Sequence, residues 1–298
     1  QPHSYKDLPY RIAETTAVYR NEKSGEVSGL VRVKALTQDD THHMVRPDQI
    51  QSEIEMILGL MDRTYQTFGF NEYKIQISVR DPKNPAKYFG DNTLWEKSEK
   101  ILIDAVKKWG RPFVVEEGEA AFYGPKIDIM VRDSIGRMWQ LTTVQLDFNQ
   151  PENFEMTYTG EDGDKHRPAV LHVAILGSVE RFMGILIEHY AGHFPLWLAP
   201  VQARVIAISE KFQQYAAGVL ADLRRVGIRA DIADADETLG KRIRQAQIEK
   251  IPYVLVVGEE EQKNNTVAVR HFKLGDLKEL KAADLIARLQ KEITERAS

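Results

Sequence analysis

The feature that most constrains the fold is a change of sequence pattern at Phe194–Pro200, where two prolines interrupt a helix. Upstream of this point, short segments of alternating polar and apolar residues predict mostly antiparallel strands. Downstream, strands alternate with helices, which is the pattern of a parallel sheet with helices on its faces. The sequence therefore predicts two domains, with limits at residues 1–198 and 199–298.

The first domain is predicted to have an α+β fold built on an antiparallel sheet. Apolar residues at helical spacing follow Pro47, a favoured residue at a helix start, and continue to Phe68. The expected strands are 18–22 and 30–35, joined as a hairpin by a polar turn, and 73–79, 126–133, 137–148 and 169–176. Further helices are expected near 94–109 and after Ser178.

The second domain is predicted to be a smaller α/β unit. Its expected strands are 203–208, 228–232, 253–257 and 267–271. The expected helices are 212–226, 239–249 and a closing helix, with a turn around Asn264 and Asn265. This order predicts a mainly parallel sheet.

Composition excludes several classes of protein. The 298 residues carry a formal net charge of -4, which argues against a broad cationic surface for nucleic acid. There is no cysteine, so disulfides and thiolate metal ligands are excluded, and no apolar run is long enough to span a membrane. A cytoplasmic location is expected. The first residue is Gln1, and we expect the chain to be an excerpt of a longer polypeptide.

The run Leu36–His43 combines an amide, two carboxylates and two imidazoles directly after the predicted strand 30–35. This is the composition of a functional site rather than of a core. The predicted hairpin would also hold the charged residues Arg20, Glu22, Arg32 and Lys34 near one another. A solvated hairpin face with paired charges is the alternative.

A second candidate lies in Gly177–Phe182, where Ser178 is a plausible helix N-cap. Arg181 then falls in the first turn, so its guanidinium and the free N–H groups would form an anion site. An arginine that merely reaches a surface partner is the alternative.

Polar residues elsewhere add to this site. Gly124 and Pro125 predict a tight turn that presents Tyr123 and Lys126 at the edge of the sheet. Gln145 shares a strand face with Thr143 and Asp147, so that face is predicted to look into water or a cleft. His172 is either a hydrogen-bonded core residue or, with His42, a metal ligand, although two imidazoles leave a zinc site incomplete. We expect His43, His166 and His271 at the surface.

Taken together, these segments resemble the class II aminoacyl-tRNA synthetases, and most closely those of the threonyl type. Tyr19–Val33 resembles the family's motif 2, and Gly177–Phe182 resembles motif 3. The threonyl-type signatures are Thr37–His42, Phe122–Lys126, Thr143–Phe148 and Leu171–His172. The segments Gly240–Arg244 and Val267–Arg270 resemble the family's anticodon-binding domain. The similarity covers essentially the whole chain in order and spacing.

The resemblance implies a threonine-tRNA ligase that uses ATP and Mg²⁺ to form threonyl-adenylate and then charges tRNA(Thr). It implies that Arg20 and Arg181 hold the ATP phosphates, that Arg20 also meets the substrate carboxylate, and that Lys126 lies near the reacting groups. Further implied contacts are Glu22, Arg32 and Gln145 to the nucleotide, Gln38, Asp40, Tyr123 and Gln145 to threonine, and His42 and His172 to Zn²⁺. For tRNA, it implies anticodon readout by the second domain.

Within that domain, Arg244 on a helix and Arg270 at the end of a strand are the predicted tRNA contacts, with Asp236 and Glu261 as weaker candidates for base contacts. The alternative is that Lys241–Arg244 is a solvated helical face. No membrane contact is expected.

The chain departs from the family pattern in several respects. Motif 1, which builds the dimer interface, the zinc-ligating cysteine upstream of motif 2 and the editing domain of many relatives have no counterpart, and Leu36 stands where an aromatic ring commonly stacks on adenine. We therefore expect a homodimer only for a full-length protein, and catalysis by this chain alone is in question. The alternatives are a non-catalytic tRNA-binding or regulatory relative and a class II ligase of prolyl or seryl type.

Overall fold

The computed structural model describes residues 2–297, which divide into two compact units. The first unit extends to Glu188 and the second begins at His189. Leu196 packs in the core of the second unit, so the segment before Pro200 contributes to that core. Each unit is described separately below.

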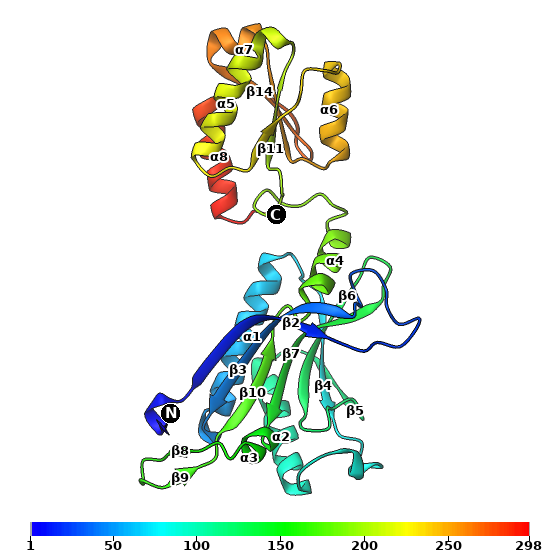
Figure 1. The fold of residues 1–298 in the computed structure, drawn as a ribbon, viewed down its shortest axis with the longest axis vertical. Helices are drawn as coiled ribbons and strands as arrows, with labels where there is room; N and C mark the ends of the chain where they lie inside the picture. The colour runs from blue at the N-terminus through cyan, green and yellow to red at the C-terminus, as the bar shows by residue number, and fades with distance from the viewer. Residues whose placement is uncertain (1, 298) are drawn as a thin grey trace. The chain divides into compact units, whose positions relative to one another are not determined.

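The first unit is built on a seven-stranded sheet (Figure 1). In spatial order the strands are β2 (Tyr10–Tyr19), β3 (Ala35–Val45), β10 (Ala169–Ala174), β7 (Met138–Asp147), β6 (Lys126–Arg132), β4 (Tyr73–Val79) and β5 (Phe113–Glu117). All neighbours are antiparallel except β4 and β5. A small sheet adds β1 (His3–Ser4), β8 (Tyr158–Thr159) and β9 (Lys165–His166). The predicted antiparallel α+β fold is confirmed.

Helices α1 (Ile50–Thr67), α2 (Asn92–Trp109), α3 (Asn149–Asn153) and α4 (Val179–His189) complete this unit. A 3₁₀ turn at Pro47–Gln49 leads into α1, whose apolar stripe is buried. The Tyr65 hydroxyl lies 2.8 Å from Thr142 Oγ1, which ties α1 to β7. Helix α2 starts at an Asp91 N-cap that accepts from the Leu94 N–H at 2.8 Å, and it ends at Gly110 in the left-handed region.

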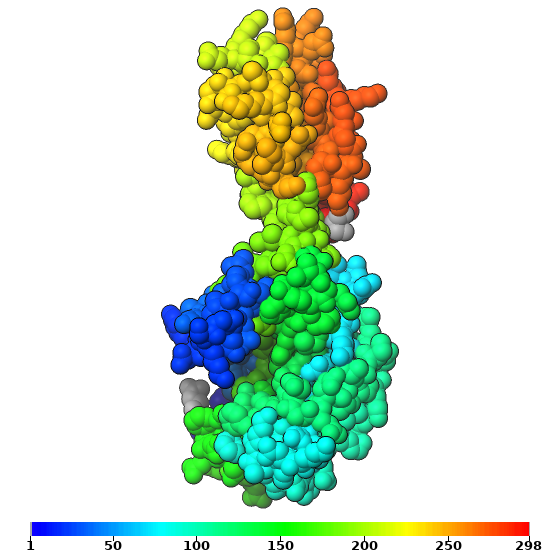
Figure 2. Space-filling view, turned by 90° about the vertical axis from the view of Figure 1, so that its right-hand side faces the viewer, coloured from blue at the N-terminus to red at the C-terminus, as the bar shows by residue number. Residues whose placement is uncertain are grey.

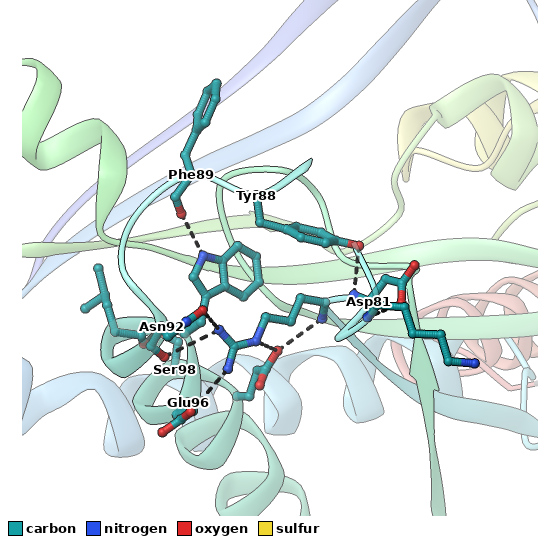
Figure 3. A network of polar contacts seen from close by, with 11 residues as sticks. Asp81, Tyr88, Phe89, Asn92, Glu96 and Ser98 are labelled. Carbon is teal, nitrogen blue, oxygen red and sulfur yellow. Dashed lines mark hydrogen bonds and ion pairs between the residues drawn. The ribbon is translucent and has the colours of Figure 1, made fainter. Parts of the chain in front are cut away.

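The loop between β4 and α2 packs against Trp95, and Figure 3 labels Tyr88 and Phe89 of this loop. The Trp95 indole N–H donates to the Phe89 carbonyl at 2.6 Å, and the Tyr88 ring lies 5.1 Å from the indole. Arg80 adds a hydrogen bond of 3.0 Å to the Asn92 side chain and an ion pair with Glu99. Buried aromatic packing therefore fixes this segment, which contains two prolines and one glycine.

The predicted hairpin of strands 18–22 and 30–35 is wrong in position. Strand β2 ends at Tyr19 and β3 begins at Ala35, so residues 20–34 form the connection between them. Gly29 has a φ of 48° there, and Ser28 and Arg32 form an isolated bridge. Apolar and basic side chains alternate in Val31–Lys34 as they would in a strand. The observed strand is β3, which contains the polar run Leu36–His43.

The second unit has a five-stranded sheet with helices on both faces (Figure 1). Its strand order is β12 (Ala230–Ile232), β11 (Ala203–Ala207), β13 (Tyr253–Val257), β14 (Thr266–His271) and β15 (Gly275–Lys281). The first three strands are parallel, and β14 and β15 pair antiparallel. The sheet is thus mixed rather than mainly parallel, because the connections after β13 are too short for parallel crossovers.

Two apolar cores hold the second unit together. Helices α5 (Gln213–Arg225) and α8 (Ala282–Thr294) pack on one of them, and α6 (Leu239–Ile248) packs on the other. The short helix α7 (Glu259–Asn264) and strand β15 were not predicted. Within residues 2–297, no helix is both long and apolar enough to cross a bilayer.

Two histidines predicted at the surface are buried. His43 Nδ1 lies 2.8 Å from Glu53 Oε1, and His271 packs 4.6 Å from the Tyr253 ring. Burial and the charges of Arg288 and Lys273 lower the pKa of His271 to about 4. His166 is exposed, as predicted.

Candidate active site

Strand β3 presents alternate residues to a cavity of about 360 Å³ in the first unit. Leu36, Gln38, Asp40 and His42 line the cavity, whereas the intervening residues do not. This split follows from the period of two along a strand. Figure 2 shows the unit hollowed between the blue N-terminal segment and the teal-to-green segment. The polar run therefore supplies one wall of a site, as its composition indicated.

One row of side chains crosses four neighbouring strands at the same level of the sheet. His42 on β3 is the cross-strand partner of His172 on β10, His172 is the partner of Gln145 on β7, and Gln145 is the partner of Lys126 on β6. All of these residues line the cavity, and the rings of His42 and His172 lie 4.7 Å apart. Residues from four distant parts of the sequence are thus brought together by strand register alone.

The carboxylate of Asp147 supports this row from within the protein. Asp147 is fully buried, and its Oδ2 lies 2.8 Å from His172 Nε2. Its Oδ1 accepts from the N–H groups of Asn149 and Gln150 at 2.7 and 3.0 Å. A carboxylate that binds one imidazole nitrogen leaves the other for a ligand, which is common around metal sites. Across residues 2–297, however, no three His, Cys, Asp or Glu side chains are placed to hold a metal ion.

Tyr123 forms another part of the cavity wall. Its ring lies 5.7 Å from that of His172, and burial together with the charges of Asp147 and Asp40 raises the pKa of its hydroxyl. Gly124 is required beside it, since a Cβ there would lie 2.1 Å from the Leu146 carbonyl oxygen. Gln145 Nε2 donates to the Gly124 carbonyl at 3.1 Å. The turn thus positions a neutral hydroxyl next to the carboxylates.

Cationic side chains gather at another part of the cavity. Arg20 and Arg181 both line it, and Arg181 donates to the carbonyls of Val31 and Gln140 at 2.7 and 2.8 Å. The predicted cap is confirmed, because Ser178 Oγ accepts from the Arg181 N–H at 3.2 Å. Burial lowers the pKa of Arg181, and the charges of Arg20 and Arg32 lower it further. Guanidinium groups that repel one another across a cavity favour binding of an anion.

Two predicted nucleotide contacts lie beside the cavity rather than among its lining residues. Arg32 pairs with Glu22 at 2.9 Å and with Glu26 at 3.2 Å in the connection between β2 and β3. The Arg20 N–H donates to the Lys34 carbonyl at 2.7 Å, so the charged residues of this segment do lie together as predicted.

Comparison with known proteins identifies a family for each of the two units. Residues 2–190 match the family described as tRNA synthetase class II core domain (G, H, P, S and T), and residues 202–292 match the family described as Anticodon binding domain. A crystal structure of the RNA binding domain of threonyl-tRNA synthetase from Cryptosporidium parvum Iowa II is 36% identical, with a TM-score of 0.91, and the match covers 97% of this chain and 72% of that one. The chain belongs to the threonyl-tRNA synthetase family.

Curated relatives agree with this assignment. The threonine–tRNA ligase of Chloroherpeton thalassium is 50% identical over 99% of this chain, and that of Clostridioides difficile is 47% identical over the whole of this chain. The chain spans 45% and 46% of these two proteins. A prolyl-tRNA synthetase structure from Cryptosporidium parvum, at 17% identity and a TM-score of 0.71, shares the fold.

The predicted tRNA contacts lie in the unit that matches the anticodon-binding family. Arg244 is exposed on α6, and Arg270 is exposed on β14, where it borders a cavity with Ile243 of α6. Asp236 is exposed in the loop before α6. The Glu261 carboxylate accepts from the Gly258 N–H at 2.8 Å and so caps α7.

Sequence reasoning assigned no role to Asp39 or Glu180, which bind backbone groups around this site. It placed Asp147 on the polar face of β7 but not against His172. Contacts of this kind join residues far apart in the sequence, and only the fold reveals them.

Proposed function

We propose that the protein carrying this sequence activates threonine with ATP and transfers it to tRNA(Thr). The observation that carries the proposal is the shared cavity, in which the row from His42 to Lys126 meets the guanidinium groups of Arg20 and Arg181. The relatives named threonine–tRNA ligase support it. Because the chain spans less than half of their length, the complete reaction is a proposal.

In this proposal one end of the cavity binds ATP and the other end binds the amino acid. Arg20 and Arg181 bind the ATP phosphates, and Arg20 also orients the threonine carboxylate that attacks the α-phosphorus, from which pyrophosphate leaves. Cations aimed at the charge that develops there lower the barrier, and a fixed nucleophile removes much of the entropic cost. Glu22 and Arg32 support the nucleotide from the connection between β2 and β3.

The other end of the cavity holds the amino acid. Gln38, Asp40, Tyr123 and Gln145 supply the hydrogen-bonding groups that a small polar substrate needs, and Gln145 also reaches the nucleotide. Lys126, which also lines the cavity, lies near the reacting groups in this proposal. A site built to hydrogen-bond a substrate hydroxyl discriminates strongly against an analogue that lacks it.

Metal ions complete the proposal. Mg²⁺ accompanies the ATP phosphates, as is usual in phosphoryl chemistry. His42 and His172 fit part of a zinc site, with Asp147 holding one imidazole, but the remaining ligands would have to come from outside this sequence or from the substrate. Bound zinc would supply a Lewis acid that polarises substrate groups. A homodimer and a cytoplasmic location also remain proposals.

The direct test is ATP–pyrophosphate exchange by the natural protein that carries this sequence, with threonine, serine, proline or no amino acid. We expect exchange that depends on threonine, since the proposed pocket is built for its hydroxyl and amino groups. Equal exchange with proline or serine would point to another class II ligase. Binding of tRNA without any exchange would instead identify a non-catalytic relative.

Zinc gives a separate prediction. We expect the isolated 298-residue chain to retain little zinc after dialysis, because two imidazoles lack the thiolate or third ligand of a stable site. Metal analysis of the dialysed chain is the measurement, and zinc titration before dialysis should show weaker binding in His172→Ala than in the parent or in the control His189→Ala. Stoichiometric zinc that persists in the His172→Ala chain would contradict the proposed ligands.

Anticodon recognition gives another prediction. We expect Arg270→Ala to weaken binding of the cognate anticodon stem-loop by about 1–3 kcal/mol and to relax discrimination against a changed anticodon base. Arg225→Ala, which removes an exposed arginine of α5, is the matched control. Titrations at fixed salt measure both effects. Equal losses for cognate and altered stem-loops would mark Arg270 as a phosphate contact.

A further inference from the structure

Two carboxylates link β3 to the start of α4. One lies on the strand and binds the segment before the helix, and the other lies on the helix and binds the strand. Asp39 accepts hydrogen bonds from the N–H groups of Ile175 and Leu176, each at 2.9 Å, and of Gly177 at 2.8 Å. In return, the Glu180 carboxylate at the start of α4 accepts from the Thr37 N–H, with both oxygens at 2.9 Å. Neither carboxylate lines the cavity. Two carboxylates outside the cavity lining therefore clasp the strand and the helix start together.

The clasped segment, residues 175–177, lies between two regular elements. Strand β10 ends at Ala174 and helix α4 begins at Val179, so these N–H groups fall outside a ladder and outside the helix. Gly177 has a φ of 73°, and a Cβ there would lie 2.4 Å from the Leu141 carbonyl oxygen. Ser178 forms an isolated bridge with Gln38. The Asp39 carboxylate thus satisfies the N–H groups of residues 175–177 and fixes the orientation of this irregular backbone.

Arg181 lies four residues after Gly177, the last residue of this segment. Its backbone N–H is capped by Ser178, and its side chain reaches the carbonyls of Val31 and Gln140 while the guanidinium lies 5.4 Å from the centre of the Trp139 ring. A displacement of residues 175–177 would shift the first turn of α4 and with it the guanidinium. Small displacements of a charged group reduce its effect on a bound anion strongly.

We propose that Asp39, assisted by Glu180, is a positioning residue that fixes Arg181 at the nucleotide end of the cavity. The inference rests on the proposed function in one respect, namely that Arg181 binds ATP phosphates. Asp39 itself touches no substrate.

The effect of Asp39 should be confined to the nucleotide. Gln38 and Asp40 lie on β3, which its ladders with β2 and β10 hold on both sides in addition to the bridge between Gln38 and Ser178. Loss of the clasp therefore releases the start of α4 and leaves the amino-acid wall in place. A residue that acted only on overall stability would affect both substrates alike.

The experiment compares Asp39→Asn with the parent in the natural protein that carries this sequence. The amide has the same shape, but its NH₂ group faces backbone donors that need an acceptor. We expect the dissociation constant for ATP, measured by calorimetry without threonine, to rise about tenfold, as for one lost charge-assisted hydrogen bond. The KM for ATP in pyrophosphate exchange should rise similarly, whereas the KM for threonine should stay within about twofold.

Glu53→Gln is the matched control. Glu53 is also buried, accepts from Arg11 and lies 2.8 Å from His43, a β3 residue outside the cavity, but it does not contact residues 175–177. We expect it to lower the melting temperature without changing the affinity for ATP. Parent-like ATP affinity in Asp39→Asn, or an equal loss in Glu53→Gln, would overturn the inference.

Further measurements separate this inference from the proposed function. Amide hydrogen exchange at residues 175–177 should be faster in Asp39→Asn, whatever the reaction. If Asp39→Asn does not fold, Glu180→Gln should give a smaller rise in the same ATP constant, and parent-like affinity there would count against the inference. A parent that binds ATP but exchanges no pyrophosphate would refute the proposed function, while the comparison of ATP affinities still decides the role of Asp39.

Discussion

Replacing Arg181 with alanine is expected to lower threonine-dependent ATP–pyrophosphate exchange by about 10- to 150-fold. This range corresponds to the loss of a charge-assisted phosphate contact of about 1.5–3 kcal/mol. The expectation follows from the half-buried guanidinium, which carbonyl groups hold at the cavity beside Arg20. The measurement is kcat/KM for ATP at saturating threonine.

Arg167→Ala is the matched control for this substitution. The Arg167 guanidinium also donates to two backbone carbonyls, of Pro151 at 3.2 Å and Met156 at 3.0 Å, but it does not line the cavity. Exchange close to the parent rate is expected for Arg167→Ala. Comparable losses in both variants would show that Arg181 acts through folding and not through the phosphates.

Replacing Trp95 with alanine is expected to destabilise the first unit by about 3–5 kcal/mol, the usual cost of removing a buried aromatic side chain. The indole is 3% exposed, contacts the Tyr88 ring and donates to the Phe89 carbonyl (Figure 3). Its removal leaves a cavity and frees the loop that follows β4. Urea denaturation followed by circular dichroism measures the free energy of unfolding.

Trp109→Ala offers a control of the same residue type on the same helix. Trp109 is the last residue of α2 and is only half-buried, so a clearly smaller loss is expected. An equal loss in both variants would mean that the packing of the loop against Trp95 does not explain the destabilisation by Trp95→Ala.

Local patterns were enough to predict the long elements of the fold. The helix after Pro47, strand 73–79 and the strand–helix alternation after Pro200 each have an apolar face that repeats with a clear period. The short strand β5, the two-residue strands of the small sheet and β15 carry no such repeat. Their existence depends on pairing with strands that are already in place.

The sequence predicted which residues contribute to the site, but not which segment forms its strand or which distant residues pair. A strand whose cavity face is polar lacks the usual alternation of apolar and polar residues, so no strand was predicted for Leu36–His43. The neighbouring segment 30–35 alternates and so predicts a strand, but β3 begins only at Ala35. The pairing of Asp39 with residues 175–177 and of Asp147 with His172 could not be predicted, because hydrogen bonds between distant segments have no local signature.

The alternation along β3 makes its length unusually intolerant of change. One inserted residue near its start would rotate Asp39 and His43 into the cavity wall and turn Gln38, Asp40 and His42 away from it. Two inserted residues would restore the facing but would carry His42 past His172, so the ring contact across the strands would be lost. The strand therefore tolerates only one register against β10, and a change in its length should abolish the site even where the sheet still forms.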